Sequence, residues 1–179
     1  MATKSLLNEN LQVRRAVQLI EMGARMQVLE SETGLAYERL LRLYREVTGK
    51  SPSKGQLPYS TDWFTEWQPN IHASLFLNIY EHLNKTCAVE QIDLIAKAYD
   101  LYLAEIHVAG VEAMLSITRA WRLVKFVDSD MLCLTRCTKC GGNFVTHSHD
   151  YTQSFQTLVC GLCAPPARAG KSKRQGTIH

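Results

Sequence analysis

Residues 137–163 read CTKCGGNFVTHSHDYTQSFQTLVCGLC and contain two Cys-x2-Cys pairs that are separated by nineteen residues. A two-residue gap lets both sulfurs of a pair face one metal ion from a tight turn, and four thiolates at such spacing are typical of zinc. Glycines at positions 141, 142 and 161 permit the sharp backbone that these turns need. The pattern predicts two such turns at the ends of a β-hairpin, closed by a metal ion into a zinc ribbon.

The four cysteines predict a structural metal rather than a catalytic one. Zinc in enzymes keeps three protein ligands and an open position, whereas four thiolates complete the tetrahedron. We expect one zinc ion per chain, which stabilises a segment too small to have a core of its own. Disulfides, a redox-active pair, an iron–sulfur cluster and a mixed ligand set are alternatives that the spacing leaves open. The predicted ligands are Cys137, Cys140, Cys160 and Cys163.

Other cysteines and histidines near this stretch have less definite roles. Cys133 precedes the first pair by four residues and could compete as a ligand, whereas Cys87 is interpreted as a small buried side chain between two helices. His147 and His149 alternate along the chain, so both would project from one face of a strand. For these histidines we favour hydrogen bonding or surface contact over metal binding.

The preceding part of the chain, residues 1–130, predicts a bundle of helices. Apolar residues recur there with the helical period, and amphipathic helices have to pack against one another. Gly49 supplies a helix stop, and residues 48–62, rich in Gly, Pro, Ser and Thr, predict a loop or arm. After Ser129 the apolar pattern alternates, which predicts short strands. The apolar helical segments are 13–24, 40–47, 75–83, 95–102 and 114–124, and the strand candidates are 131–137, 143–150 and 154–160.

A candidate DNA-binding element lies within this helical region. Residues 24–47 have the outline of a helix-turn-helix, with Gly34 at the turn. Arg39, Arg42 and Arg45 recur every three residues and form a strip beside the apolar face of the second helix. Arginine suits bidentate contacts to guanine or phosphate, although charged helix faces are often simply solvated. DNA contact and contact with solvent or a partner both stay open at this point.

The net charge of +3 conceals an uneven distribution. Residues 1–56 carry nine basic and six acidic side chains, residues 57–130 five and ten, and residues 131–179 six and one, so their net charges are +3, −5 and +5. Basic ends around an acidic middle suggest that the ends meet an anion. We expect a zinc ribbon over residues 131–166 and a flexible basic tail over residues 167–179. The tail residues predicted to contact DNA are Lys171, Lys173 and Arg174.

Composition excludes several classes of protein. Hydrophobic residues make up 46% and charged residues 21%, unlike a disordered regulator. No run approaches the roughly 18 apolar residues of a membrane helix, and the N-terminus lacks the apolar segment of a secretory signal, so we expect a cytoplasmic protein without membrane contact. No Gly-rich phosphate loop, nucleophile elbow or paired-carboxylate signature is present, so we expect neither an enzyme nor a small-molecule substrate.

Six stretches carry a resemblance to a known family: GARMQVLESETGL (23–35), LPYSTDWF (57–64), IHASLF (71–76), ITRAWRLVKFV (117–127), CGGNFVTHSH (140–149) and CGLCAPP (160–166). Together they resemble the FlhC family, the zinc-containing subunits of a bacterial flagellar transcriptional activator. The resemblance spans about residues 12–168 and implies that the family's four zinc-binding cysteines fall on the two pairs named above. It also implies a hetero-hexamer with FlhD that binds flagellar promoter DNA and recruits RNA polymerase.

Two other functions fit parts of the same sequence. A zinc-ribbon adaptor would bind proteins and never touch DNA itself, in which case the basic tail would not matter for promoter binding. A thiol–disulfide enzyme would need reducible cysteine pairs with a lowered pKa and no bound zinc. The first alternative differs from an activator subunit in its DNA contacts, and the second differs in its metal content.

Overall fold

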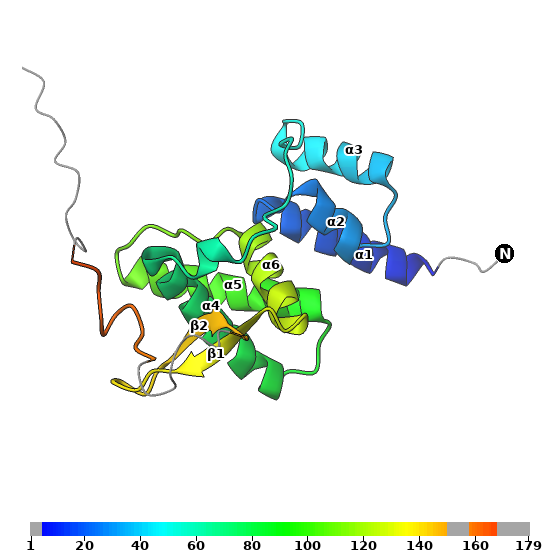
Figure 1. Ribbon diagram of the computed structural model, residues 1–179. Coiled ribbons are helices and arrows are strands. Elements are labelled where there is room, and N and C mark those ends of the chain that lie inside the picture. Colours follow the sequence, from blue (N-terminus) through cyan, green and yellow to red (C-terminus); the bar gives the residue numbers. More distant parts are fainter. Residues whose placement is uncertain (1–4, 150–157, 168–179) are drawn as a thin grey trace, which may run out of the picture.

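The computed structural model describes residues 5–149 and 158–167 (Figure 1). In these ranges six α-helices are followed by one two-stranded sheet, which confirms the predicted fold class, mainly α with a small C-terminal β-hairpin. A short 3-10 helix, η1 (Asp62–Phe64), lies between the third and fourth helices. The other elements are α1 (Leu6–Glu21), α2 (Met26–Glu32), α3 (Tyr37–Thr48), α4 (Trp67–Thr86), α5 (Gln91–Val108), α6 (Ile117–Asp128), β1 (Leu132–Arg136) and β2 (Asn143–His147).

Helices α1, α2 and α3 pack on one another as a group that stands apart from the sheet (Figure 1). Helix α3 buries Leu40 completely, while Leu43, Tyr44 and Val47 lie partly buried against the same core. This is the apolar face that the sequence predicts for residues 40–47. Its burial determines which side of α3 faces outward.

Polar contacts join this group to the remaining helices. The buried guanidinium of Arg15 in α1 donates two hydrogen bonds, of 3.0 and 2.8 Å, to the carboxylate of Asp93 in α5. The indole N–H of Trp121 in α6 donates a 2.7 Å hydrogen bond to Glu32 at the end of α2. The two helical groups are therefore tied by one charged and one neutral donor, each paired with a carboxylate.

The second group, α4 to α6, has an aromatic core. The rings of Phe76 and Tyr102 meet edge to face with centroids 6.5 Å apart, and Phe64 meets Phe126 in the same way at 5.9 Å. All four rings are buried, as expected of large apolar side chains at helical spacing. This core supports the outer surface of α4, on which the hairpin lies.

The predicted arm between the two groups follows α3 and has no helix or strand from Gly49 to Thr61. Side chains of the helices hold it through its backbone. Gln27 donates a 2.9 Å hydrogen bond to the carbonyl of Gly55, and Arg122 donates one of 3.0 Å to the carbonyl of Pro58. Arg25 donates a further bond to the carbonyl of Gln56. The arm is thus fixed along the surface by three donors from α2, its N-terminus and α6.

The hairpin of β1 and β2 packs on α4 (Figure 1). The strands are antiparallel with Leu134 opposite Val145, and the side chains of Leu132 and Val145 enter the same core as the helices. The hairpin therefore shares its hydrophobic core with the helical part of the chain, in keeping with a segment too small to have its own.

Two predicted features lie wholly or partly outside the described residues. The third strand candidate, residues 154–160, is described only from residue 158, and residues 158–160 form no strand. Nearly all of the basic tail, from residue 168 onward, is also outside, and with it Lys171, Lys173 and Arg174. The first two strand candidates are confirmed as β1 and β2.

Candidate functional site

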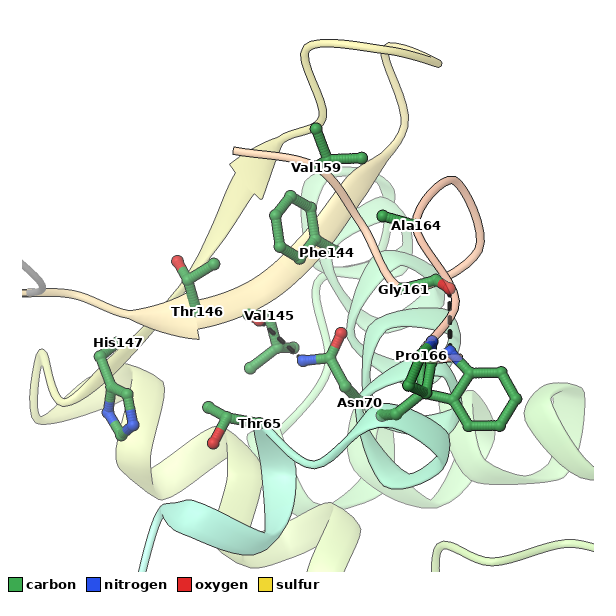
Figure 2. Close-up of a pocket in the computed structure, with 11 residues that line it drawn as sticks. Thr65, Asn70, Phe144, Val145, Thr146, His147, Val159, Gly161, Ala164 and Pro166 are labelled. Atoms are coloured by element: carbon green, nitrogen blue, oxygen red, sulfur yellow. Dashed lines mark hydrogen bonds between the residues drawn. The ribbon is translucent and has the colours of Figure 1, made fainter. Parts of the chain in front are cut away.

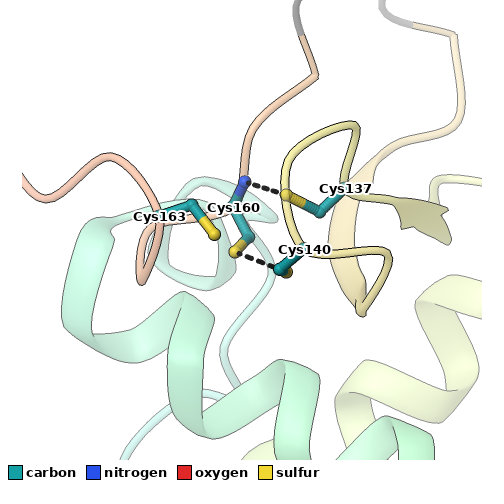
Figure 3. Close-up of side chains that lie close together, drawn as sticks. All are labelled: Cys137, Cys140, Cys160 and Cys163. Atoms are coloured by element: carbon teal, nitrogen blue, oxygen red, sulfur yellow. Dashed lines mark hydrogen bonds between the residues drawn. The ribbon is translucent and has the colours of Figure 1, made fainter.

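The four predicted ligand cysteines lie together (Figure 3), at the end of the hairpin that is distant from helix α3 (Figure 1). Their sulfur atoms are all within 4.8 Å of one another. Cys137 and Cys140 come from the turn that follows β1, and Cys160 and Cys163 from the C-terminal loop. Two segments twenty residues apart are thus brought to one point.

The spacing of the sulfurs fits a tetrahedral zinc ion. With metal–sulfur bonds of about 2.3 Å, a regular tetrahedron places neighbouring sulfurs about 3.8 Å apart. The Sγ atoms of Cys140 and Cys160 are 3.8 Å apart. All six cysteines of the chain fall in the described ranges and are free thiols, so the four sulfurs meet without a disulfide. The donor set and its dimensions suit one four-coordinate ion and leave it no open position.

Each pair is shaped by its own tight turn. The N–H of Gly141 donates to the carbonyl of Cys137 at 2.9 Å, and the N–H of Cys163 donates to that of Cys160 at 3.0 Å. Gly141 has a left-handed φ of 74°, as the sequence predicts for a sharp turn. For Gly142 and Gly161 that explanation is wrong, since neither adopts a left-handed φ.

The two turns are also joined to each other. Thr138 donates both its N–H and its hydroxyl to the carbonyl of Leu158, at 2.9 and 3.0 Å. The N–H of Cys160 donates to the sulfur of Cys137 at 3.3 Å, and Lys139 Nζ donates to the carbonyl of Cys163 at 3.2 Å. An N–H directed at a sulfur favours the thiolate, the form that binds metal.

The pKa values of two of the clustered thiols are shifted in opposite directions. Backbone N–H groups, of Cys160 first and Cys140 second, lower the pKa of the Cys137 thiol to about 6. A hydrogen bond with Cys140, followed by burial, raises the pKa of the Cys163 thiol to about 12. Each thiolate that forms makes the next harder to form, because like charges gather in one place. A divalent cation among them stabilises all four charges together.

The remaining cysteines lie elsewhere. Cys133 is on β1 opposite Thr146, whose hydroxyl lies 3.5 Å from its sulfur, so Cys133 faces across the hairpin and is not one of the clustered thiols. Cys87 follows Thr86, the last residue of α4, and packs half-buried against the core, so it is less buried than its interpretation as a small buried side chain predicts. Neither is part of the four-sulfur group.

The two histidines do not share a strand face as predicted, because β2 ends at His147. His149 lies in the turn beyond it, with its Nε2 atom 3.2 Å from a carboxylate oxygen of Asp130. His147 borders an open pocket of about 450 Å³ between β2 and the start of α4 (Figure 2). It is the one ionisable side chain among the described residues that line this pocket, so the pocket holds no acid–base pair.

Helix α4 contributes residues to the site that sequence reasoning did not single out. Asn70 donates a 2.8 Å hydrogen bond to the carbonyl of Val145 (Figure 2). The hydroxyl of Ser74 accepts the N–H of Val145 at 2.9 Å. The indole N–H of Trp67 donates to the carbonyl of Gly161 at 2.8 Å. Trp67, Asn70 and Ser74 recur at helical spacing and so share one side of α4, which could have indicated a contact surface. Polar residues at such spacing, however, are normally interpreted as a helix face exposed to solvent.

The helix-turn-helix prediction corresponds to α2, a turn over residues 33–36, and α3. Arg39, Arg42 and Arg45 are all exposed on the outer side of α3. Arg39 forms an ion pair with Glu9 of α1. Arg42 and Arg45 make no side-chain hydrogen bond or ion pair within residues 5–149 and 158–167. Two of the three arginines are therefore available to an outside anion.

Comparison with known proteins gives the chain a family. The family model described as "Flagellar transcriptional activator (FlhC)" matches residues 1–176. The chain belongs to the FlhC family. The resemblance noted in the sequence is thereby confirmed over nearly the whole chain.

Several relatives are similar along most of their length, and each is named "Flagellar transcriptional regulator FlhC". The protein of Verminephrobacter eiseniae (strain EF01-2) is 59% identical over 175 residues, covering 98% of this chain and 93% of the relative. That of Thauera aminoaromatica is 51% identical, with 100% and 90% covered, and that of Gallionella capsiferriformans (strain ES-2) is 50% identical, with 99% and 97% covered. Transcriptional regulators are not a class of enzyme, which sets the FlhC family apart from the thiol–disulfide enzymes considered above.

The helices of this FlhC-family chain do not have the character of membrane spans. Within the described ranges, none of them combines the length and the apolar composition that crossing a bilayer requires.

Proposed function

We propose that this chain is a zinc-containing, DNA-binding subunit of a transcriptional activator, which acts in the cytoplasm, binds flagellar promoters together with FlhD and recruits RNA polymerase. The observation that carries the proposal is the outer side of α3. There Arg42 and Arg45 are exposed and lack an intramolecular partner in the described part of the chain, within a family of flagellar regulators.

In this proposal the chain is divided by role. Residues 1–130 dock FlhD and a second copy of the chain, residues 131–166 form the zinc-dependent module, and residues 167–179 are a basic tail. The charge distribution supports this division, because residues 57–130 are acidic and both ends are basic. DNA attracts the basic ends, whereas the acidic middle suits contacts between proteins.

The metal ion of this subunit is zinc, one per chain, bound by the four clustered thiolates. Their number, their mutual distances and the N–H directed at Cys137 support this assignment. When bound, the ion cross-links the two cysteine turns and stabilises the hairpin. It supplies no catalysis, because four thiolates leave it no position for water or substrate.

The DNA contacts are assigned to Arg42 and Arg45 first. Arg39 would have to exchange Glu9 for a phosphate, so we assign it a smaller contribution. Lys171, Lys173 and Arg174 are assigned to phosphate contacts on their sequence alone. Contacts to phosphate position the protein on the duplex, and a few contacts to base edges select the site.

The test measures binding of a labelled flagellar promoter duplex by the complex of this chain with FlhD. The double variant Arg42→Ala, Arg45→Ala should weaken binding about 10- to 100-fold and lower the salt dependence of binding by about two ion equivalents. Lys97→Ala is the matched control, because Lys97 is an exposed cation on α5, in the acidic middle of the chain. Transcription from the same promoter by purified RNA polymerase then tests recruitment.

Two outcomes would reassign this face. If the double variant no longer bound FlhD, so that loss of promoter binding followed from loss of the complex, α3 would be the partner interface. If this variant and a triple alanine variant of Lys171, Lys173 and Arg174 both bound the promoter like the wild type, the chain would be a zinc-ribbon adaptor that leaves DNA contact to its partner.

A further inference from the structure

The second cysteine pair is held by a residue far from it in the chain. Trp67 opens α4, and its indole Nε1–H donates a 2.8 Å hydrogen bond to the carbonyl of Gly161. Gly161 lies between Cys160 and Cys163, so this bond fixes the backbone of the turn that presents both thiols. Figure 2 shows Gly161 at the edge of the pocket, with the dashed line that marks this bond.

The contact is close enough to explain the glycine. A Cβ atom at position 161 would lie 2.8 Å from Cδ1 and 3.2 Å from Nε1 of Trp67. Separations under 3.0 Å do not occur between such atoms, so any larger residue would displace the indole. Gly161 is required here for the approach of a side chain rather than for a left-handed backbone.

The first cysteine pair is anchored to the same helix by a different route. It follows β1, and the hairpin is bound to α4 by Asn70 and Ser74 at Val145 and by Asn78, whose amide donates to the carbonyl of Asn143 at 3.0 Å. These side chains lie four residues apart along α4 and contact the free edge of β2. The second pair belongs to no strand in residues 158–167, so no strand edge attaches it to α4.

We propose that Trp67 is a positioning residue for the metal centre: through Gly161 it holds the Cys160–Cys163 turn against α4, so that retention of the ion depends on a helix outside the ribbon. This inference rests on the zinc centre proposed above. Helix α4 then holds both halves of the ligand set, one through the strand and one through the indole. Loss of the metal ion removes one constraint on the Cys160–Cys163 turn. Loss of the hydrogen bond from Trp67 removes another, and the turn then releases the metal ion more readily.

The test uses the full-length chain, co-expressed with FlhD, and follows transfer of its zinc to a chromogenic chelator. Trp67→Phe keeps a ring but removes the N–H donor, and the loss of one hydrogen bond should speed release about 2- to 10-fold. Trp63→Phe is the matched control, since Trp63 lies against Phe64 and Arg119 instead of the cysteine turns. Equal release from the two variants would overturn the role of Trp67.

A second pair of variants tests the same contact from the side of Gly161, in case Trp67→Phe folds poorly. Gly161→Ala places a methyl group within 2.8 Å of the indole and should also speed release. Gly34→Ala, away from the cysteine turns, meets no atom within 4 Å and should not. Because both changes break one contact, Trp67→Phe combined with Gly161→Ala should release zinc no faster than the faster single variant. Additive effects would contradict a shared contact.

Fluorescence gives a readout that a general loss of stability would not reproduce. Removal of zinc should change the indole emission of the wild type and of Trp63→Phe, and that change should vanish in Trp67→Phe. An emission change that persists in Trp67→Phe would overturn the coupling. A wild-type chain that contains no zinc would contradict the metal centre itself, whereas equal release from zinc-loaded variants contradicts only the part played by Trp67.

Discussion

Asn70 and Val145, 75 residues apart in the chain, are joined by a buried 2.8 Å hydrogen bond from the side-chain amide of α4 to a backbone carbonyl of β2. The same amide donates a second 2.8 Å bond to the carbonyl of Phe64. The side chain of Asn70 therefore provides a hydrogen-bond donor for one carbonyl at the edge of β2 and for another at the end of η1. An unpaired buried carbonyl is costly, so this residue should matter more than its small size suggests.

Replacement of Asn70 by Ala should lower the free energy of unfolding by about 2–3 kcal/mol, because two buried carbonyls lose their donor. The measurement is urea denaturation followed by circular dichroism. Asn10→Ala is the control, since Asn10 is exposed on α1 and should change the stability by less than about 0.5 kcal/mol. Equal denaturation midpoints for the two variants would show that the hairpin does not depend on this bond.

Replacement of Cys137 or Cys160 by Ser should abolish stoichiometric zinc binding, because three thiolates and a hydroxyl are a far weaker ligand set. Cys133→Ser should retain about one zinc per chain, since Cys133 faces Thr146 across the hairpin. Metal analysis of the purified proteins checks both results. Zinc lost from Cys133→Ser, or retained by Cys160→Ser, would require a different ligand set.

His72 should make the protein less stable in mild acid. It is buried on α4, its Nδ1 atom is 2.8 Å from the hydroxyl of Tyr102, and burial lowers its pKa below the ordinary value of 6.5. The unfolded chain then binds the proton more readily than the folded one. The stability that this group contributes is complete above the unfolded pKa and declines as the pH falls below about 6.5.

Denaturation measured at pH 7.5 and pH 5.5, on either side of that value, tests the effect of His72. His72→Asn keeps a polar atom near Nδ1 but cannot titrate, so the difference in stability between the two pH values should shrink. His82→Asn is the control, because His82 is exposed on the same helix. An unchanged pH dependence in His72→Asn would assign the acid sensitivity to other groups.

The ion pair of Arg15 joins the two groups of helices, so its loss should lower the stability of the whole chain. The side chain of Arg15 is 4% exposed, it contacts Asp93 and Glu90 at 2.8 Å each, and the hydrogen bond to Asp93 raises its pKa. Arg15→Ala leaves Asp93, itself partly exposed, without its partner and should cost about 2 kcal/mol. Arg14→Ala, at an exposed neighbouring position, should have little effect on the thermal midpoint. Similar midpoints for the two variants would show that the ion pair is not a link.

Local patterns in the sequence were sufficient for the features that depend on neighbouring residues. The spacing within each cysteine pair predicts its turn, and the stop at Gly49 and the apolar face of α3 are confirmed in place. Each of these features depends on contacts within about one turn of backbone or on a single helical period. Which four thiols cluster was predictable for another reason, because two pairs with the same Cys-x2-Cys spacing together make one four-thiolate ligand set.

The contacts that position the site were not predictable in this way. Asn70 and Ser74 would be interpreted as a solvated helix face, and only the arrival of β2 turns them into donors and acceptors for a strand. Trp67 would be interpreted as core, since nothing nearby in the sequence indicates that it meets Gly161. Gly161 was singled out for a wrong reason. A glycine that allows close approach of a side chain and a glycine that allows a left-handed backbone cannot be told apart in a sequence.

The arm after α3 is attached in an unusual way, since Gln27, Arg25 and Arg122 all donate to its carbonyl oxygens. Every residue type carries that acceptor. The path of the arm is therefore determined largely by donors in the helices on either side of it. Its exposed side chains can change, whereas Gly55, with a φ of 142°, and Leu57, which packs against the core, are constrained. A short exposed tag introduced near Lys54 should leave the flanking helices in place, which makes this loop a suitable point for labelling the protein.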